Sequence, residues 1–253
     1  MTFPIMTGAD PYTEYQSDKG ILFLHGFTGS PHEHRWMARE FAGMGYSVSV
    51  PLLAGHGTSP QDLKETTWLD WYTSARQALF DLKKKSSNIV IVGLSMGGTM
   101  ALHLSAHYEV DGVAALASPL FLNDWKLKFL PVMKHILTEK PKRDGADIKD
   151  PLQKQKAVHY MTQPLRSIEQ LLKLFNHVKD DLPDIHVPVL LVNAVQDHVV
   201  PFENREYIKQ NINSKDVREL TLHDCYHIIT LDTEREKVLN TLKIFIEDII
   251  GKP

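Results

Sequence analysis

The chain of 253 residues contains little cysteine, no long apolar run and no marked excess of either charge. Its single cysteine, Cys225, cannot form an intramolecular disulfide, which excludes a small secreted fold held together by disulfides. No run of about 18 apolar residues occurs, so a membrane-spanning helix is not predicted. The first residues also lack the basic segment and the long apolar segment of a signal peptide. We therefore expect a compact, soluble and cytoplasmic protein.

Charge balance and length limit the classes of partner. The 28 Lys and Arg residues nearly balance the 31 Asp and Glu residues, and the formal net charge is −3. This balance gives no electrostatic reason to expect a nucleic acid or an anionic membrane surface. The chain is long enough to bury a real core, and single α/β domains often have this length. We expect a small-molecule partner, no nucleic acid and no stable membrane insertion. The sequence does not indicate an oligomeric state.

Short apolar runs alternate with longer helical patterns, which is typical of βα units around a mostly parallel sheet. Residues 88–93 and 187–193 are almost continuously apolar, as expected of parallel strands that helices cover on both faces. Further strands are predicted at residues 21–25, 47–50, 112–117 and 217–222. Helical spacing of apolar residues occurs at residues 68–82, 96–108 and 233–250. The order predicts an α/β fold with a mostly parallel sheet flanked by helices.

Residues 119–186 interrupt this alternation. They contain amphipathic helical patterns at residues 120–137 and 164–178 but no convincing strand. An insertion between two late strands would lie over one end of the sheet, where the ligands of open α/β sheets bind. We therefore predict a catalytic core formed by residues 1–118 and 187–253. Residues 119–186 are predicted to form a helical cap, or lid, that shapes the pocket and excludes water.

A candidate nucleophile follows one of the buried strands. Residues 93–97 read Gly-Leu-Ser-Met-Gly and match G-x-S-x-G, the pattern of a nucleophile elbow. The pattern is weak alone, but here it follows an apolar strand and opens a predicted helix. Such a tight turn strains the backbone of the serine and leaves no room for side chains at its neighbours. A capping serine at an ordinary helix start would explain one glycine but not the whole arrangement. Ser95 is therefore the candidate nucleophile.

A serine nucleophile needs a base that accepts its proton and a carboxylate that orients the base. Asp197 and His227 each follow the end of a predicted late strand, at the same edge of the sheet as Ser95. Their order along the chain, serine, acid and then histidine, is that of a serine hydrolase with a nucleophile elbow. Asp184 precedes its strand and Asp232 follows the histidine, so neither fits as well.

An oxyanion hole would complete such a site. Its two donors are usually the backbone N–H after the nucleophile and an N–H from the loop after an early strand. Met96 supplies the first donor. Residues 25–29, His-Gly-Phe-Thr-Gly, follow an early strand and make the N–H of Phe27 the candidate for the second. The alternative is a loop without chemistry, which agrees less well with three independently placed triad residues.

Residues 223–227, His-Asp-Cys-Tyr-His, look like a metal-binding cluster. Two histidines four residues apart converge on zinc when they lie on a helix. This segment instead leaves a predicted strand and has no helical pattern. We therefore predict no metal ligands and no cofactor. Cys225 is expected to be a bystander thiol, because no basic neighbour is placed to lower its pKa.

Several motifs together resemble those of the small bacterial carboxylesterases and monoacylglycerol lipases of the α/β-hydrolase fold. The matching segments are residues 25–29, 55–57, 93–98, 197–201 and 226–232. The resemblance covers nearly the whole chain. It implies Ser95 as the nucleophile, Asp197 as the acid and His227 as the base. It also implies Phe27 and Met96 as oxyanion donors and a helical cap between two late strands.

These features predict a serine hydrolase that cleaves short- to medium-chain acyl esters through an acyl-enzyme intermediate. The apolar lid favours a medium-length acyl chain, and the resemblance favours monoacylglycerols. C–C bond hydrolases and acyltransferases share the triad and remain alternatives, as does a non-catalytic binding protein of the same fold. Dehalogenases and epoxide hydrolases typically use an aspartate at the elbow, where this chain has Ser95.

Overall fold

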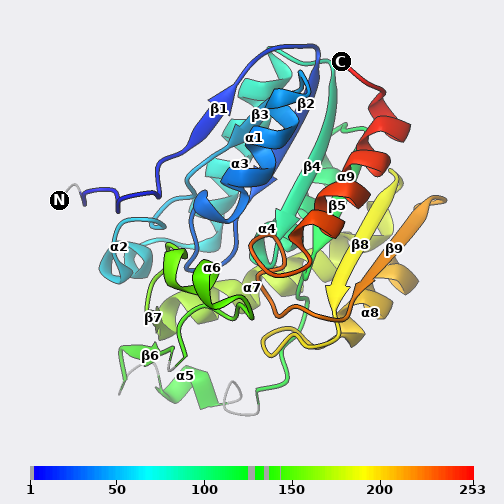
Figure 1. Ribbon diagram of the computed structural model, residues 1–253. Helices are drawn as coiled ribbons and strands as arrows, with labels where there is room; N and C mark the ends of the chain where they lie inside the picture. The colour runs from blue at the N-terminus through cyan, green and yellow to red at the C-terminus, as the bar shows by residue number, and fades with distance from the viewer. Residues whose placement is uncertain (1–2, 125–128, 134–136, 143) are drawn as a thin grey trace.

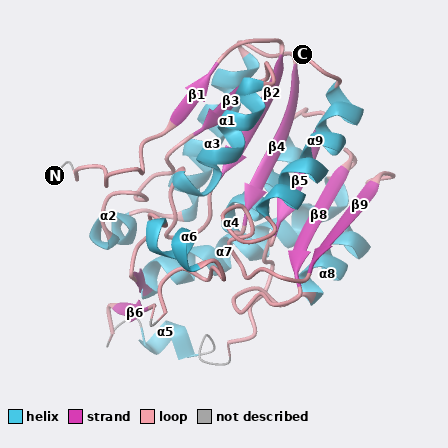
Figure 2. Ribbon diagram, in the orientation of Figure 1, coloured by secondary structure: helices cyan, strands magenta, loops and turns pink. Residues whose placement is uncertain are grey.

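The computed structural model describes residues 3–124, 129–133, 137–142 and 144–253. Its centre is a seven-stranded sheet in the order β1-β3-β2-β4-β5-β8-β9 (Figures 1 and 2). The edge strand β1 (Tyr12–Glu14) is antiparallel to β3 (Ser47–Val50), and the other neighbouring pairs are parallel. The remaining strands are β2 (Lys19–Leu24), β4 (Asn88–Leu94), β5 (Gly112–Leu116), β8 (Val189–Ala194) and β9 (Val217–Leu222). The predicted α/β class with a mostly parallel sheet is confirmed.

Helices cover both faces of the sheet (Figure 1). The helices α1 and α9 lie on one face, and α3, α4 and α8 lie on the other, where α7 packs on α3 and α4. The helices are α1 (His32–Gly43), α2 (Pro60–Glu65), α3 (Trp68–Lys83), α4 (Met96–His107), α5 (Leu130–Met133), α6 (Pro151–Lys156), α7 (Leu165–Asp181), α8 (Glu203–Asn211) and α9 (Arg235–Ile250). Among the described residues, no helix combines the length and the apolar character needed to cross a bilayer.

The strands feed two apolar cores because successive side chains point to opposite faces of a sheet. In β2, Ile21 and Phe23 pack with α1 and α9, whereas Leu22 and Leu24 pack with α3 and α4. The strands β5 and β8 are buried along their whole length. Polar groups therefore gather where the strands end. Since β4, β8 and β9 run in the same direction, the residues that follow them meet at one edge.

The chain leaves the sheet after β5 and returns to it at β8. Here the predicted helix at residues 120–137 is wrong in extent. Residues 120–124 form no regular element and α5 spans only Leu130–Met133, while residues 125–128 and 134–136 lie outside the described part. Two short antiparallel strands, β6 (Glu139–Pro141) and β7 (Thr162–Pro164), were not predicted. Three residues ending in proline carry no recognisable alternation. The division into core and cap stays a prediction.

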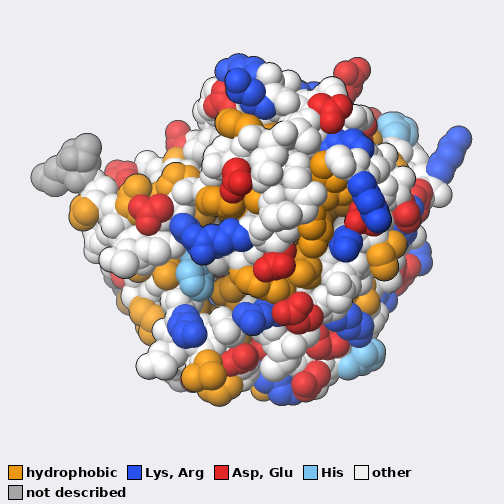
Figure 3. All heavy atoms as spheres, turned by 45° about the horizontal axis from the view of Figure 1, so that its top comes forward, with side chains coloured by type: hydrophobic (Ala, Val, Ile, Leu, Met, Phe, Trp, Pro, Cys, Tyr) orange, Lys and Arg blue, Asp and Glu red, His pale blue; other side chains and the backbone are white. Residues whose placement is uncertain are grey.

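Charged side chains are distributed as the balanced composition leads one to expect. On the face drawn in Figure 3, acidic and basic side chains are intermixed around exposed hydrophobic ones. This mixture agrees with the formal net charge of −3. An electrostatic attraction to a polyanion would instead need positive charge gathered on one surface.

Candidate active site

The turn between β4 and α4 holds Ser95 in an unusual backbone conformation. Its φ and ψ angles are 55° and −122°, a region that residues with a side chain rarely adopt. A Cβ atom on Gly93 would lie 2.1 Å from the carbonyl oxygen of Gly97, and one on Gly97 would lie 2.0 Å from that of Leu24. Both glycines are therefore required by close backbone contact. The turn presents the serine side chain at the carboxyl edge of the sheet.

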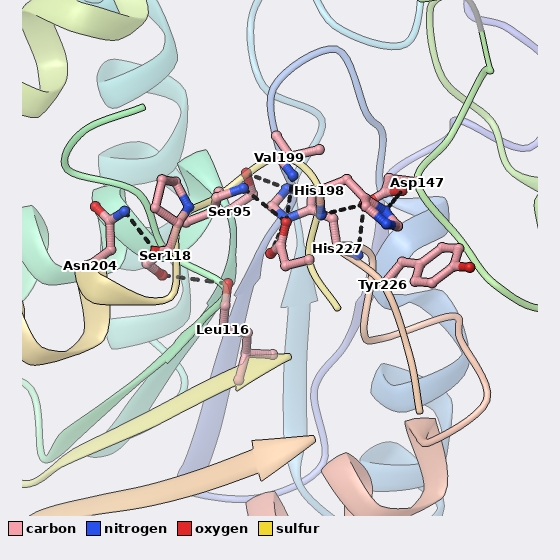
Figure 4. A network of polar contacts seen from close by, with 12 residues as sticks. Ser95, Leu116, Ser118, Asp147, His198, Val199, Asn204, Tyr226 and His227 are labelled. Carbon is pink, nitrogen blue, oxygen red and sulfur yellow. Dashed lines mark hydrogen bonds and ion pairs between the residues drawn. The ribbon is translucent and has the colours of Figure 1, made fainter. Parts of the chain in front are cut away.

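The side chains of Ser95, His227 and Asp197 form a hydrogen-bonded chain, part of which is visible in Figure 4. His227 Nε2 lies 2.9 Å from Ser95 Oγ, and His227 Nδ1 lies 2.8 Å from Asp197 Oδ2. Because Nδ1 faces a carboxylate, it carries the proton, which leaves Nε2 free to accept one. The other oxygen of Asp197 accepts the backbone N–H groups of Val199 and Val200, each at 2.8 Å.

Burial and charge act in opposite directions on this pair. The side chains of His227 and Asp197 are 9% and 3% exposed. Burial by itself lowers the pKa of His227, but the charge and hydrogen bond of Asp197 outweigh it, and the pKa is raised above 6.5. Burial raises the pKa of Asp197, but His227 and the two backbone N–H groups lower it below 3.8 overall. The site therefore favours an ionised carboxylate beside a basic imidazole.

The loop that carries His227 is fixed by two further carboxylates. Asp147 Oδ2 accepts the backbone N–H of His227 at 3.2 Å, and its Oδ1 lies 2.9 Å from His198 Nδ1 (Figure 4). Asp232 is 1% exposed and accepts backbone N–H groups from Lys149, Asp150, Tyr226 and Thr233. Asp232 is therefore not part of the chain of Ser95, His227 and Asp197, and it holds the loop of His227 against the segment before α6.

Met96 directly follows the serine, and Phe27 lies in the loop after β2. A Cβ on Gly26 would lie 3.3 Å from Ser95 Cβ, so the loop after β2 lies directly against the elbow. Within the described part of the chain, neither N–H group donates to a protein acceptor. His25 holds the loop, because its Nε2 accepts the N–H of Leu53 at 3.2 Å. Burial lowers the pKa of His25 to about 4, so this histidine is neutral.

A cavity of about 690 Å³ lies beside the serine, and it is lined by residues at the sheet edge and by described residues between Pro119 and Phe175. One part of its wall is apolar and consists of Phe27, Leu122, Ile168, Leu171 and Phe175. Another part is polar and includes Glu33, Lys142, Asp147 and His159. Such a mixture of apolar walls and a few polar groups is typical of a small-molecule site.

Glu33 and Lys142 are two charged residues of the cavity wall that the sequence did not predict, and both contact the loop after β2. Glu33 is 6% exposed and accepts the N–H of Gly26 at 2.7 Å. Burial raises the pKa of Glu33 to about 7, although the Gly26 hydrogen bond and Lys142 oppose this. Lys142 is partly buried and donates to Thr28 Oγ1. Burial lowers its pKa to about 8. In the sequence, Glu33 stands among polar residues of a helix start, so nothing marks it as a site residue.

Residues 223–227 do not form a group of metal ligands in the described structure. His223 is exposed and lies after a strand, as expected. Cys225 is buried, and burial raises the pKa of its thiol. The predicted site residues, in contrast, meet around one point, and their catalytic roles are proposed below.

A mostly parallel sheet with a serine at a strand-to-helix elbow, followed along the chain by an aspartate and a histidine, defines a hydrolase of the α/β-hydrolase fold. The chain belongs to the serine aminopeptidase S33 family, whose model matches residues 15–234.

The chain is also similar to named enzymes along almost its whole length. It is 34% identical over 244 residues to a thermostable monoacylglycerol lipase of Bacillus sp. (strain H-257), with 94% of each chain covered. It is 27% identical over 241 residues to a carboxylesterase of Bacillus subtilis (strain 168), with 94% of this chain and 96% of that chain covered. A solved structure from work on LipS and LipT, two metagenome-derived lipolytic enzymes, matches with a TM-score of 0.93 and 32% identity. That match covers 97% of this chain and 100% of the other. The predicted class, a carboxylic-ester hydrolase, is confirmed by these relatives.

Proposed function

We propose that Ser95, His227 and Asp197 hydrolyse carboxylic esters through an acyl-enzyme. Ser95 Oγ attacks the ester carbonyl while His227 Nε2 accepts its proton, and Asp197 orients the imidazole and stabilises its charged form. The observation that carries the proposal is the chain of hydrogen bonds, 2.9 Å and 2.8 Å long, that links the three side chains beside the cavity. His227 then gives the proton to the leaving alcohol, and a water molecule hydrolyses the acyl-enzyme by the same steps.

The N–H groups of Phe27 and Met96 serve as the oxyanion hole. Negative charge develops on the carbonyl oxygen during the attack, and preorganised donors stabilise it without reorganisation. Two features support this assignment: the loop after β2 lies against the elbow, and both donors are free of protein acceptors in the described structure. Losing one such donor typically costs about 10²–10³ in rate.

The apolar wall of the cavity suits an acyl chain of short to medium length. Phe27 comes from the elbow side, and Ile168, Leu171 and Phe175 come from one side of α7. A chain lying against these side chains would leave the ester carbonyl at Ser95. Burial of each methylene group contributes about 0.8 kcal/mol. We therefore expect kcat/KM to rise with acyl-chain length until the chain extends beyond the apolar wall.

The polar wall supports an alcohol with free hydroxyl groups, such as glycerol. Glu33 and Lys142 both line the cavity, and the charge of each acts on the pKa of the other. A hydroxyl group between them can donate to the carboxylate and accept from the ammonium. The name of the 34% identical relative agrees with monoacylglycerol as the substrate class. Cytoplasmic location belongs to the same proposal, and the unpaired thiol of Cys225 is consistent with it.

The family description raises an aminopeptidase as a second candidate. That activity needs a group that attracts the α-ammonium of a peptide, and Glu33 is a carboxylate in the cavity. The positive charge of Lys142 acts on the same region and opposes a second cation. The ester is therefore the favoured substrate.

A substrate panel tests the proposal. We expect kcat/KM to increase from acetyl to octanoyl or dodecanoyl p-nitrophenyl esters, with 1-monolauroylglycerol a good substrate and aminoacyl p-nitroanilides poor ones. A strong preference for acetyl esters, or faster cleavage of the anilides, would overturn the substrate class. The Ser95→Ala variant should lose at least about 10⁴-fold in rate and should not react with a fluorophosphonate. Parental activity in that variant, or an unlabelled parent protein, would overturn the mechanism.

A further inference from the structure

Two helices that pack against each other each carry a pair of metal-ligand side chains with a spacing of four residues. His103 and His107 lie on α4, and His177 and Asp181 lie near the end of α7. Residues four apart project from the same side of a helix, so each pair presents both side chains together. This site lies at the far end of α4 from Ser95, which precedes the first residue of that helix.

The distances bring three of these side chains to one point. Asp181 Oδ2 lies 2.5 Å from His103 Nδ1, and Asp181 Oδ1 lies 3.2 Å from His107 Nε2. One ligand atom from each of the three residues lies within 4.8 Å of the others. The side chains of His103 and Asp181 are 9% and 16% exposed, and that of His107 is 43% exposed, so the group is held from within and reachable from solvent.

The carboxylate of Asp181 faces imidazoles on both of its oxygens. No Lys or Arg side chain forms an ion pair with it in the part of the chain that the structure describes. The rings of Trp68 and Tyr72 lie 5.9 Å and 4.8 Å from that of His103, and they make one wall of the site. A carboxylate in such surroundings is stabilised by a cation more strongly than it would be in water.

We propose that His103, His107 and Asp181 bind a divalent transition-metal ion of the zinc type. Two imidazole nitrogens and one carboxylate oxygen are a common protein donor set for Zn²⁺, whereas Ca²⁺ and Mg²⁺ prefer oxygen ligands alone. Metal–ligand bonds of about 2.0–2.2 Å place neighbouring ligand atoms roughly 3.3 Å apart in a tetrahedron. The Asp181–His103 contact would therefore open slightly. A water molecule or His177, whose ring lies 4.7 Å from that of Trp68, would complete the coordination.

The ion would tie α7 to α4. The helix α7 contributes Ile168, Leu171 and Phe175 to the apolar wall of the cavity, and its last residue, Asp181, is a proposed ligand. Metal binding would therefore fix the helix that forms the acyl wall against the helix that begins at the nucleophile. The expected consequence is a more stable protein, with the reacting atoms themselves unchanged.

The test uses untagged full-length protein that has been treated with a chelator and dialysed. Calorimetric titration should show one Zn²⁺ bound per chain with a Kd on the order of 1 µM or lower, and Zn²⁺ should raise Tm. The variants His107→Ala and Asp181→Asn should each weaken binding at least about tenfold. His186→Ala, which removes an exposed histidine outside the group, is the matched control and should bind as the parent does.

The following results would overturn the inference. The inference would be wrong if the parent protein bound no Zn²⁺ at 100 µM, a concentration on the order of a hundredfold above the expected Kd. It would also be wrong if the protein bound Ca²⁺ or Mg²⁺ in place of Zn²⁺. Equal binding by His107→Ala and the parent would move the ion to another part of the molecule. Circular dichroism and fluorophosphonate labelling of Ser95 show whether a variant is folded, independently of metal binding.

Discussion

The imidazole of His227 is influenced by carboxylates at two distances. Asp197 contacts Nδ1 directly at 2.8 Å, whereas Asp147 and, more weakly, Glu33 in the cavity wall act on the imidazole through their charges. Burial by itself lowers the pKa of His227, but these negative charges, with Asp197 foremost, raise it above 6.5. The histidine is therefore a stronger base than usual, which suits a group that takes a proton from Ser95.

The pH dependence of catalysis should report this balance. Only neutral His227 accepts the serine proton, so kcat/KM should rise with pH and reach its half-maximal value above pH 6.5. Asp197→Asn removes the main charge that raises this pKa, so the midpoint should move to lower pH while the rate falls by about 10⁴-fold. Initial rates with p-nitrophenyl butyrate at subsaturating concentration measure both effects. An unchanged midpoint would contradict the assigned pairing.

The Glu33 and Lys142 side chains should distinguish alcohols rather than acyl chains. Glu33→Gln and Lys142→Met should each lower kcat/KM for 1-monolauroylglycerol by about tenfold or more, because each removes a hydrogen bond to a charged group. Ethyl laurate has the same acyl chain and no free hydroxyl group, so its kcat/KM should change by less than about threefold.

The comparison of the two esters makes this prediction specific. Equal losses for both esters would mean that the variants disturb the loop after β2, where the N–H of Gly26 donates to Glu33. The glycerol assignment would then be wrong, whereas ester hydrolysis by Ser95 would stand. Parental rates with 1-monolauroylglycerol would contradict any contact between these side chains and the alcohol.

At the scale of elements, the nucleophile elbow depends on glycines that cannot be replaced. A Cβ on Gly97 would lie 2.0 Å from the carbonyl oxygen of Leu24, a backbone atom that cannot move aside as a flexible side chain could. Gly97→Ala should therefore lower the free energy of unfolding by at least about 2 kcal/mol and abolish most of the esterase activity. Urea unfolding followed by fluorescence and a p-nitrophenyl ester assay measure the two quantities.

The matched control lies on α1. A Cβ on Gly43 would meet no heavy atom within 4 Å, and its φ is not positive. Gly43→Ala should leave activity unchanged and stabilise the protein by up to about 1 kcal/mol, since alanine favours a helix. Similar effects of the two substitutions would show that the elbow tolerates a side chain.

Some elements of the fold and the site could be predicted from the sequence, and others could not. The buried strands β4 and β8 are long apolar runs, so their positions were predictable. The meeting of Ser95, Asp197 and His227 was also predictable, because each of them follows a strand that ends at the same edge of the sheet. The strands β6 and β7 are too short for an alternating pattern. Glu33 and Lys142 come from distant segments, and only their common position in the cavity wall gives them significance. His103 and Asp181 likewise come from distant segments, and only the packing of α7 on α4 brings their side chains together.

At the scale of the whole molecule, one buried carboxylate joins the loop that carries His227 to the segment before α6. Each of the two carboxylate oxygens of Asp232 accepts two backbone N–H groups at 2.7–2.9 Å. The four donors are Lys149, Asp150, Tyr226 and Thr233. These contacts bring the part of the chain between β5 and β8 against the loop of His227. If His227 is the base, Asp232 is a positioning residue that connects it to the cavity wall.

Replacing Asp232 should separate positioning from chemistry. Asp232→Ala leaves four partly buried hydrogen bonds without their charged acceptor, so the free energy of unfolding should fall by at least about 3 kcal/mol. We expect kcat to fall by about tenfold or more because His227 is held less firmly. The midpoint of the pH profile should remain, since the Asp197–His227 pair is intact. Asp232→Asn keeps one oxygen acceptor and should lie between the parent and the alanine variant.

The exposed neighbour Asp224 provides the control. It lies on the same loop and forms an ion pair with Lys149, but its side chain is 68% exposed. Asp224→Ala should therefore change stability by less than about 1 kcal/mol and leave kcat near the parental value. If Asp224→Ala and Asp232→Ala behaved alike, the loop would be held by general surface charge. A shift of the pH midpoint in Asp232→Ala would instead mean that Asp232 acts on the imidazole itself, and its role would be electrostatic rather than one of positioning.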